Sequence, residues 1–141
     1  MKLIYWSGTG NTEEMANLIE KGIKEVGKGV EILKVGDTNV ETLKDEKILI
    51  LGCPSMGSEV LEECEFEPFI ESIEGNLKGK TVALFGSYGW GDGEWMRNWE
   101  ERMSDNGAKI ILEPLIVNNA PEGNDVDKCI NYGKEIASIN I

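Results

Sequence analysis

The sequence predicts an α/β fold in which a doubly wound parallel sheet carries helices on both faces. Segments with strand character alternate with amphipathic segments along the chain, as they do in parallel βαβ units. Two of the strand segments, residues 47–53 and 81–86, are continuous apolar runs, which suits strands that are buried on both faces. The chain has 141 residues and neither repeats nor a linker, so we expect a single domain over residues 1–141.

The first elements follow from the spacing of apolar residues. Leu3 to Tyr5 predict a short strand, and residues 11–26 predict a helix whose apolar face is formed at helical spacing by Met15, Leu18, Ile19 and Ile23. Residues 30–35 partly alternate between apolar and polar and predict the second strand. A short polar connection over residues 39–46 then takes the place of a helix.

The later elements continue the alternation. The remaining strands are expected over residues 47–53, 81–86 and 109–117, and the remaining helices over residues 67–73, 94–106 and 125–139. Each of these helices has apolar residues at helical spacing, and we expect Phe66, Phe69, Ile70, Ile73, Trp95, Met96, Trp99, Met103, Val126, Ile130, Gly133, Ile136 and Ala137 to face inward. Pro54 ends the third strand and Pro114 interrupts the last.

The loop between the first strand and the first helix has the composition of a phosphate-binding loop. It contains three hydroxyls, one amide and two glycines in the order Ser7, Gly8, Thr9, Gly10, Asn11, Thr12. Backbone N–H groups at a helix N-terminus bind phosphate well. No Lys follows before Lys21, which excludes a Walker loop, and Glu13 occupies the third glycine position of a dinucleotide fingerprint. The alternative is an ordinary loop in which Asn11 or Thr12 caps the helix.

Ligands of doubly wound sheets bind at the carboxyl ends of the strands, and two further loops there have unusual compositions. The loop after the third strand contains Met56, and the loop after the fourth places Trp90 between glycines. A flat apolar ligand between these two side chains would bury both. The alternative is that Trp90 folds back onto its own domain.

Composition excludes several classes of protein. The chain has no histidine, which removes the usual general bases and many metal ligands. Its net charge of −12 disfavours binding to nucleic acid or to an anionic membrane. Three widely spaced cysteines form neither a disulfide framework nor a metal motif, and no signal peptide is evident, so we expect a reduced, cytoplasmic protein.

Three motifs in this order resemble the flavodoxins, in particular the short-chain flavodoxins of anaerobic clostridia. The motifs are Ser7–Thr12, Met56-Gly57 and Gly86–Asp92, and the resemblance extends over the whole chain. It implies a flavodoxin-like sheet of five parallel strands in the order 2-1-3-4-5. It also implies a non-covalently bound FMN and a low-potential one-electron carrier, not an enzyme, that shuttles between redox partner proteins in place of ferredoxin.

The resemblance also implies roles for individual residues. Ser7, Gly8, Thr9, Gly10, Asn11 and Thr12 would hold the phosphate of FMN. Met56 and Trp90 would flank the ring, and Glu59 would accept a hydrogen bond from its N3–H. Ser87 and Asn119 would lie along the ribityl chain and the Gly89 N–H near the ring carbonyls, and the remaining contacts would come from Gly57, Ser58, Tyr88 and Gly91. The sequence departs from the family at Ser58, where many relatives have Asp, and at Pro54-Ser55.

Two features bear on the redox potential that this resemblance implies. We expect a type II′ turn over residues 56–59, with Gly57 at its first central position, so that the Gly57–Ser58 peptide can flip and offer its carbonyl to flavin N5–H on reduction. Between Ile48 and Leu77 lie seven acidic residues and no basic residue, namely Glu59, Glu62, Glu63, Glu65, Glu67, Glu71 and Glu74. Such a cluster would disfavour the anionic reduced flavin and attract basic partners.

We therefore expect a monomer that meets the basic surfaces of redox proteins, such as reductases and oxidoreductases, and binds neither nucleic acid nor membranes. The alternative function is an FMN-dependent reductase on the same fold, although the chain has no second domain for a nicotinamide. A receiver domain is excluded, because Gly52-Cys53-Pro54 provides no phosphorylatable Asp at the end of the third strand.

Overall fold

A computed structural model describes residues 1–139 and arranges five strands in one sheet of order β2-β1-β3-β4-β5. The strands are β1 (Lys2–Tyr5), β2 (Glu31–Lys34), β3 (Ile48–Gly52), β4 (Thr81–Tyr88) and β5 (Leu115–Asn118). Every neighbouring pair is parallel. The predicted fold class and strand order are confirmed, and they bring the carboxyl ends of all the strands to one edge of the sheet.

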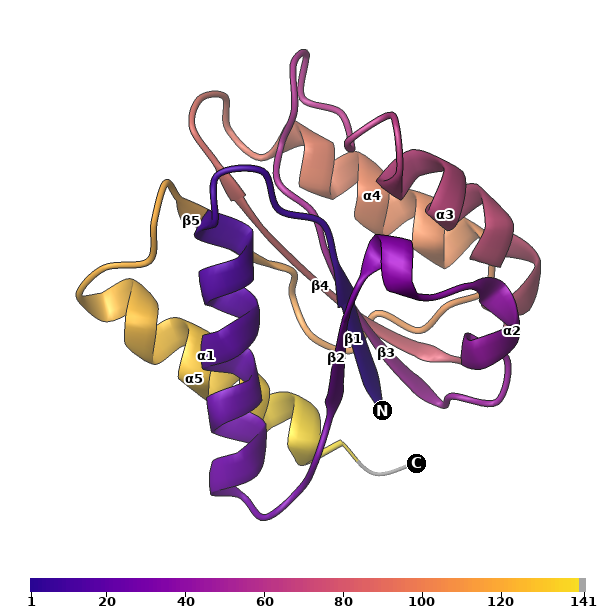
Figure 1. The fold of residues 1–141 in the computed structure, drawn as a ribbon, viewed down its shortest axis with the longest axis horizontal. Coiled ribbons are helices and arrows are strands. Elements are labelled where there is room, and N and C mark those ends of the chain that lie inside the picture. The colour runs from indigo at the N-terminus through magenta and orange to yellow at the C-terminus, as the bar shows by residue number, and fades with distance from the viewer. Residues whose placement is uncertain (140–141) are drawn as a thin grey trace.

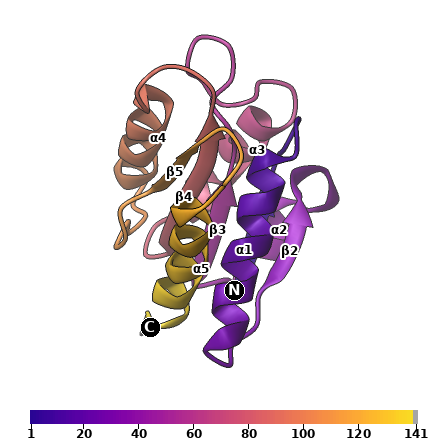
Figure 2. The same ribbon diagram turned by 90° about the vertical axis from the view of Figure 1, so that its left-hand side faces the viewer.

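Helices cover both faces of the sheet. They are α1 (Asn11–Glu25), α2 (Val40–Leu43), α3 (Phe66–Ile73), α4 (Glu94–Asp105) and α5 (Asn124–Ala137), with 3-10 turns η1 (Val35–Asp37) and η2 (Glu74–Asn76). Figure 1 shows α1 and α5 on one face and α2, α3 and α4 on the other. Figure 2, turned by 90°, shows α1 and α5 lying side by side. Within the described residues, no helix is both long and apolar enough to cross a membrane.

Three element boundaries differ from those expected. The polar connection after β2 contains the short helix α2, because Asn39 Oδ1 accepts a hydrogen bond from the Thr42 N–H at 3.3 Å and caps it. The fourth strand continues to Tyr88. The fifth begins only at Leu115, because Pro114 lacks the N–H that a ladder requires. Before Pro114, residue Lys109 forms only an isolated bridge with Thr81.

In the α1/α5 layer the backbones of the two helices are in direct contact. A Cβ added to Gly22 would lie 1.9 Å from the carbonyl oxygen of Ile130, and one added to Gly133 would lie 2.1 Å from that of Ile19. Glycine is therefore required at both positions for the two helices to approach so closely. In α5 the buried positions include Cys129 and Tyr132, which were not expected, while Val126 and Ile130 are only partly buried. The expected inward positions Gly133, Ile136 and Ala137 are confirmed.

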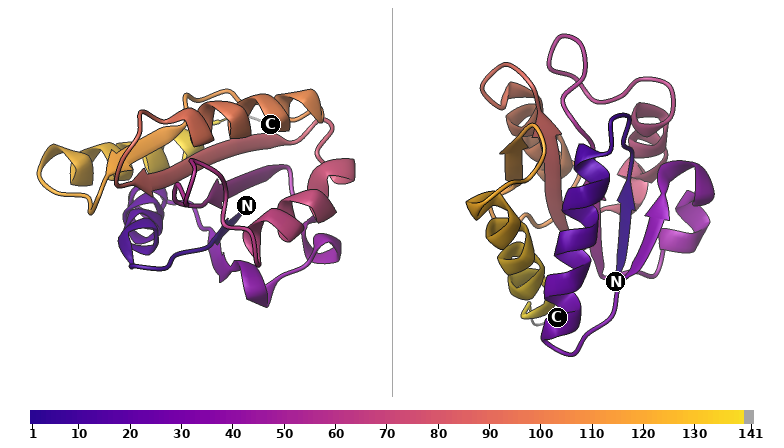
Figure 3. Two further views of the ribbon diagram at one scale, coloured as in Figure 1. Left: turned by 90° about the horizontal axis from the view of Figure 1, so that it is seen from above. Right: turned by 60° about the vertical axis from the view of Figure 1, so that its left-hand side comes forward.

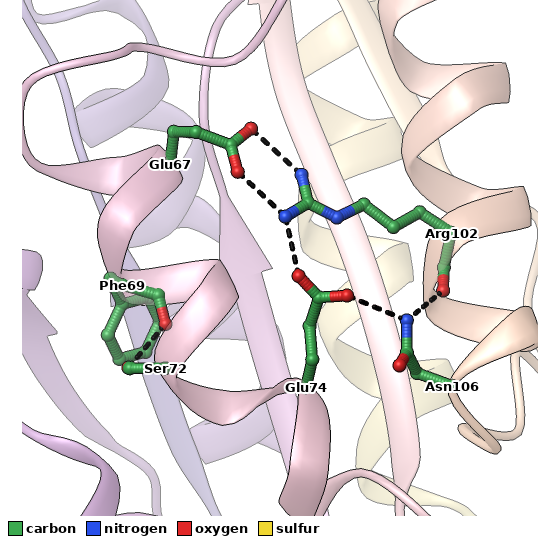
Figure 4. A network of polar contacts seen from close by, with 6 residues as sticks. All are labelled: Glu67, Phe69, Ser72, Glu74, Arg102 and Asn106. Atoms are coloured by element: carbon green, nitrogen blue, oxygen red, sulfur yellow. Dashed lines mark hydrogen bonds and ion pairs between the residues drawn. The ribbon is translucent and has the colours of Figure 1, made fainter.

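The α3/α4 layer combines large aromatic side chains with a polar network. Phe66 of α3 meets Trp99 of α4 edge-on, with ring centroids 5.4 Å apart. Outside this contact, Arg102 donates to both carboxylate oxygens of Glu67, at 2.8 and 2.7 Å, and to Glu74 at 2.6 Å. Asn106 adds a bond of 2.9 Å to Glu74, and Figure 4 shows how the guanidinium spans the two helices. This layer is thus held by side chains, and all the expected inward residues of α3 and α4 are buried.

Candidate functional site

The loops that follow β1, β3 and β4 gather at the carboxyl edge of the sheet. Figure 1 shows them at the top of the molecule, and the right-hand view of Figure 3 shows the same grouping from another side. The loop after β1 leads into α1, the loop after β3 leads towards α3, and the loop after β4 leads into α4. The three motifs of the sequence therefore meet in space, as expected for a doubly wound sheet.

The loop over residues 7–12, called the phosphate-type loop below, is held in place by the hydroxyl of its first residue. Ser7 Oγ accepts hydrogen bonds from the N–H groups of Gly10 and Glu13, at 3.2 and 3.3 Å. Gly10, with φ +97°, is the N-cap of α1, and neither Asn11 nor Thr12 caps the helix, so the cap expected in the alternative interpretation is wrong. A serine hydroxyl that accepts from two amides still has its own proton to donate. Because the Glu13 N–H is taken by Ser7, the N–H groups of Asn11 and Thr12 are the ones in the first turn of α1 that stay available to an anion.

A buried hydroxyl pair joins this loop to β4. Thr12 is only 1% exposed, and its Oγ1 lies 3.2 Å from Ser87 Oγ. The Ser87 N–H also donates to Thr12 Oγ1, at 3.4 Å. One hydroxyl must donate to the other, which leaves a single proton of the pair for any further acceptor. Thr12 and Ser87, predicted to hold different parts of one ligand, are thus direct neighbours.

Tyr5 anchors the start of α1 from the end of β1. Its hydroxyl donates to Glu13 Oε2 at 2.7 Å. Burial, together with this bond to a carboxylate, raises the pKa of Tyr5 to about 12. The bond holds the first turn of α1 against the strand that precedes the phosphate-type loop.

A cavity of about 260 Å³ opens beside the phosphate-type loop. Its lining contains many of the predicted site residues, namely Gly8, Thr9, Asn11, Met56, Ser87, Tyr88, Gly89 and Asn119. Asn119 has φ +61°, and its N–H donates to the Tyr88 carbonyl at 2.8 Å, so the turn after β5 is tied to the end of β4. The structure therefore brings residues from four strand ends around one space.

Sequence analysis did not assign two residues of this lining, Pro54 and Ser55, to the site. Trp6, for which the position just after the first strand left open a role as a wall of the phosphate loop or simply as the strand end, lines the cavity as well. The Ser55 N–H donates to the Ser87 carbonyl at 3.0 Å, which holds the segment after β3 against β4. A usable signal was present, because each of these residues follows a predicted strand by one or two positions. Gly8 lies so close to the Trp6 ring that an added Cβ would be 2.9 Å from it.

The hairpin over residues 56–60 projects beyond the cavity. Met56 and Val60 exchange backbone hydrogen bonds of 2.9 and 3.0 Å, so the loop between them has three residues. The predicted four-residue type II′ turn over residues 56–59 is therefore wrong, because Met56 pairs with Val60 and not with Glu59. Gly57 does have the expected positive φ, +47°, and Glu59 also has one, +57°. Gly57 and Ser58 are exposed.

The loop after β4 carries Trp90 outside the cavity lining. Trp90 is 63% exposed, so it does not fold back onto the domain and that alternative is wrong. Gly91, next to it, has φ +86°. Arg97 of α4 donates to the carbonyl and the carboxylate of Asp92, both at 3.0 Å, and thereby holds the loop. Trp90 is the largest exposed apolar side chain beside the site.

Fewer of the seven acidic residues between Ile48 and Leu77 are free of partners than the sequence indicates. Glu62 is 5% exposed and caps α3, because its carboxylate accepts from the N–H groups of Cys64, Glu65 and Phe66 at distances from 2.6 to 3.1 Å. Glu67 and Glu74 are paired with Arg102, so neither is a freely solvated side chain. Three of the seven acids therefore serve the structure. Glu59 also accepts a hydrogen bond, from the Glu94 N–H at 3.1 Å, and Glu63, Glu65 and Glu71 remain for a purely electrostatic role.

The residues of this edge fit a phosphate monoester joined to a flat ring. A helix N-terminus and neutral hydroxyls suit a phosphate without any cationic side chain. The cavity volume of about 260 Å³ lies just below the roughly 300–1,000 Å³ that is usual for ligand clefts. The exposed indole of Trp90 and the half-buried Met56 offer apolar surface for that ligand.

Known proteins match the chain over nearly all of its length. The family model described as Flavodoxin matches residues 3–133. A flavodoxin of Clostridium beijerinckii is 60% identical over 139 residues, which cover 99% of this chain and 100% of that protein. The solution structure of two-electron reduced Megasphaera elsdenii flavodoxin superimposes with a TM-score of 0.89 at 46% identity, and the match covers 98% of each chain.

Proposed function

Because the chain belongs to the flavodoxin family, we propose that it shuttles single electrons at low potential between redox partner proteins, in place of ferredoxin. Flavodoxins bind FMN and are electron-transfer flavoproteins, not enzymes, so the chain is an FMN-dependent electron carrier. The observation that supports the proposed site is the meeting of a neutral phosphate-type loop with a cavity between Met56 and Tyr88.

In the proposed site, the phosphate lies on the loop from Ser7 to Thr12. Ser7 keeps a proton to donate, and the Asn11 and Thr12 N–H groups at the start of α1 would donate to the same phosphate. Ser87 and Asn119 line the cavity between this loop and Gly89, where the ribityl chain would lie. Met56 and Trp90 would shield the two faces of the ring from water. When bound, FMN supplies the one-electron redox chemistry.

A backbone carbonyl of the hairpin over residues 56–60 could also accept a hydrogen bond from the ring. Gly57 has φ +47° on an exposed hairpin, where a glycine peptide can change orientation at low steric cost. We propose that its carbonyl accepts a hydrogen bond from flavin N5–H after reduction. Gly57→Ala should then shift both one-electron potentials, and potentials equal to those of the wild type would contradict this role. Gly75→Ala is a control on an exposed glycine with open space around it.

The charges at the carboxyl edge support a low potential and basic partners. Exposed acids stand on the loops of this edge, namely Glu63, Glu65, Asp92 and Glu122. Arg97, the cation nearest to them on α4, is paired with Asp92. Adding negative charge to a ring near these carboxylates is unfavourable, and salt screens exposed charges. High salt should raise the second potential modestly and slow electron transfer to a basic acceptor.

The free cysteines and the open edge around Trp90 bear on the cellular location and the oligomeric state. Cys53, Cys64 and Cys129 are all free, as expected for a reducing compartment, so we propose a cytoplasmic protein. We also propose that it acts as a monomer, because a carrier that serves several partners must leave the edge around Trp90 open.

One binding experiment tests the proposal. Purified protein mixed with FMN and dialysed should stay yellow and show quenched Trp90 fluorescence, with Trp90→Phe as the matched control for the other three tryptophans. Riboflavin lacks the phosphate and should bind about tenfold or more weakly, because it makes fewer charge-assisted bonds. A colourless protein would overturn the proposal. Equal affinity for riboflavin would overturn the role of the Ser7–Thr12 loop.

The alternative is an FMN-dependent reductase. Reduction of the bound flavin by NADPH alone, in stoichiometric amount and without a partner reductase, would favour it. We expect no such reduction, and we expect dithionite to reduce the flavin in two separate one-electron steps.

A further inference from the structure

A hydrogen bond between Glu59 and the start of α4 links the hairpin over residues 56–60 to the loop over residues 89–93. We propose that Glu59 is a positioning residue that ties these two segments together and so sets the separation of Met56 and Trp90. The tie itself follows from contacts within the chain. Its consequence for FMN rests on the proposed function.

The contact spans 35 residues of sequence. The Glu94 N–H donates to Glu59 Oε1 at 3.1 Å. Oε2 of the same carboxylate makes no hydrogen bond within residues 1–139, so it stays available to a donor such as the N3–H expected from the family. Glu59 can therefore tie the two segments and still contact a ring.

Helix α4 depends on this distant carboxylate at its amino end. Its N-cap, Gly93, has φ +95° and no side chain with which to cap. The first N–H groups of any helix lack intrahelical acceptors, and a carboxylate there also interacts favourably with the helix dipole. Glu59 thus supplies from the hairpin the capping group that the sequence next to α4 does not.

The loop next to α4 is shaped to receive the carboxylate. A Cβ added to Gly91 would lie 2.5 Å from both the carboxyl carbon and Oε1 of Glu59. With the Glu59 carboxylate in this position residue 91 has no room for a Cβ, and its φ of +86° favours glycine as well. The backbone of Glu59 also has a positive φ, +57°, which is uncommon for a residue other than glycine.

The two segments carry the two expected walls of the ring site. Met56 begins the hairpin, and its backbone bonds to Val60 place Glu59 next to the closing pair. Trp90 precedes Gly91 in the loop, and Arg97 of α4 bonds to the same loop through Asp92. Because both segments are fixed relative to α4, the Glu59–Glu94 contact determines how far apart the walls stand.

Amide hydrogen exchange at Glu94 tests the tie directly. In protein without added FMN, Glu59→Ala should accelerate exchange of the Glu94 amide about fivefold, the factor expected for one hydrogen bond of average strength. Glu59→Gln keeps an acceptor oxygen and should stay within about twofold of the wild type. Glu63→Ala removes the same charge from an exposed residue of the neighbouring segment and should not change the Glu94 amide.

The consequence for the site is measured with FMN. Glu59→Ala should weaken FMN binding and change the visible circular dichroism of the bound flavin, and Glu59→Gln should restore most of the dichroism. If Glu59→Ala does not fold, Glu59→Gly removes the same side chain and suits the positive φ. Unchanged Glu94 exchange in the variant that folds would overturn the tie. Wild-type protein that fails to bind FMN would overturn the proposed function and leave the exchange result intact.

Discussion

The two helical layers of the sheet are held by different means. On one face, α1 and α5 meet through Gly22 and Gly133, where the backbone of each helix touches the other. On the opposite face, α3 and α4 do not approach each other in this way, and Trp99 and Arg102 span the space between them. One layer is therefore set by backbone shape and the other by the length and charge of side chains.

This difference matches what each layer carries at the carboxyl edge. The phosphate-type loop opens α1, the helix with the tighter packing. The segments that carry Met56 and Trp90 lead into α3 and α4. Close-packed backbone allows little adjustment, whereas contacts made by side chains can change rotamer and partner. The phosphate end of the site is therefore held by backbone packing, and the ring end by side-chain contacts such as the Glu59–Glu94 hydrogen bond.

The largest expected effect comes from closing the glycine contact. Gly133→Ala would place a methyl group 2.1 Å from the Ile19 carbonyl oxygen, so α1 and α5 must separate. Overpacking of this kind costs roughly 3 kcal/mol, and alanine returns about 1 kcal/mol through its helix propensity. We expect a net loss of about 2 kcal/mol in the free energy of unfolding, measured by urea denaturation.

Gly29→Ala provides the control, because Gly29 is exposed and an added Cβ meets nothing within 4 Å. Its stability should stay close to that of the wild type. A Gly133→Ala protein as stable as this control would show that α1 and α5 can separate freely, and the contrast between the two layers would disappear.

A smaller effect is expected from Arg102→Leu in the α3/α4 layer. This variant leaves Glu67 and Glu74 without their cation while keeping apolar volume. The three side chains are between 26% and 30% exposed, so the loss should lie between the values for exposed and buried ion pairs, about 1–2 kcal/mol. Arg102→Lys should recover part of it, because lysine cannot bond Glu67 with two parallel N–H groups.

Salt sharpens this contrast between the layers. In 1 M NaCl the difference between Arg102→Leu and the wild type should shrink, because salt screens partly exposed charges. The difference between Gly133→Ala and the wild type should not change with the same salt. An Arg102→Leu deficit that is unaffected by salt would mean that the guanidinium acts only through packing.

The smallest effect is expected from Tyr5→Phe, on the α1/α5 face. Below pH 10 the wild type should exceed this variant by about 1 kcal/mol, the contribution of the bond to Glu13. The pKa of Tyr5 is raised from 10.0 to about 12, so the unfolded chain loses this proton first as pH increases. The advantage of the wild type should therefore fall as pH rises from 10 through about 12. Stability curves of the two proteins that stay parallel over this range would contradict the assignment.

Much of the site could be predicted because its residues are adjacent in sequence. The loop from Ser7 to Thr12 lies between a strand and a helix, and local spacing alone indicates its role. Pro54 and Ser55 were not predicted as lining residues, because only the pairing of β3 with β4 brings the segment after β3 to Ser87. The hairpin closure at Val60 was also mispredicted, because turn preferences do not determine which of two neighbouring residues pairs with Met56.

The α/β class, the alternation of strands and helices, and the family to which the chain belongs can all be inferred from the amino-acid sequence. Those features depend on apolar periodicity and on motifs that are local in the chain. Which acidic side chains stay free of hydrogen bonds and ion pairs at the site depends, in contrast, on the tertiary structure. Glu62, Glu67 and Glu74 are indistinguishable from Glu63 in the sequence, but a helix terminus or Arg102 engages each of them in the fold. Charge alone does not reveal such partners, because they come from residues that folding brings together.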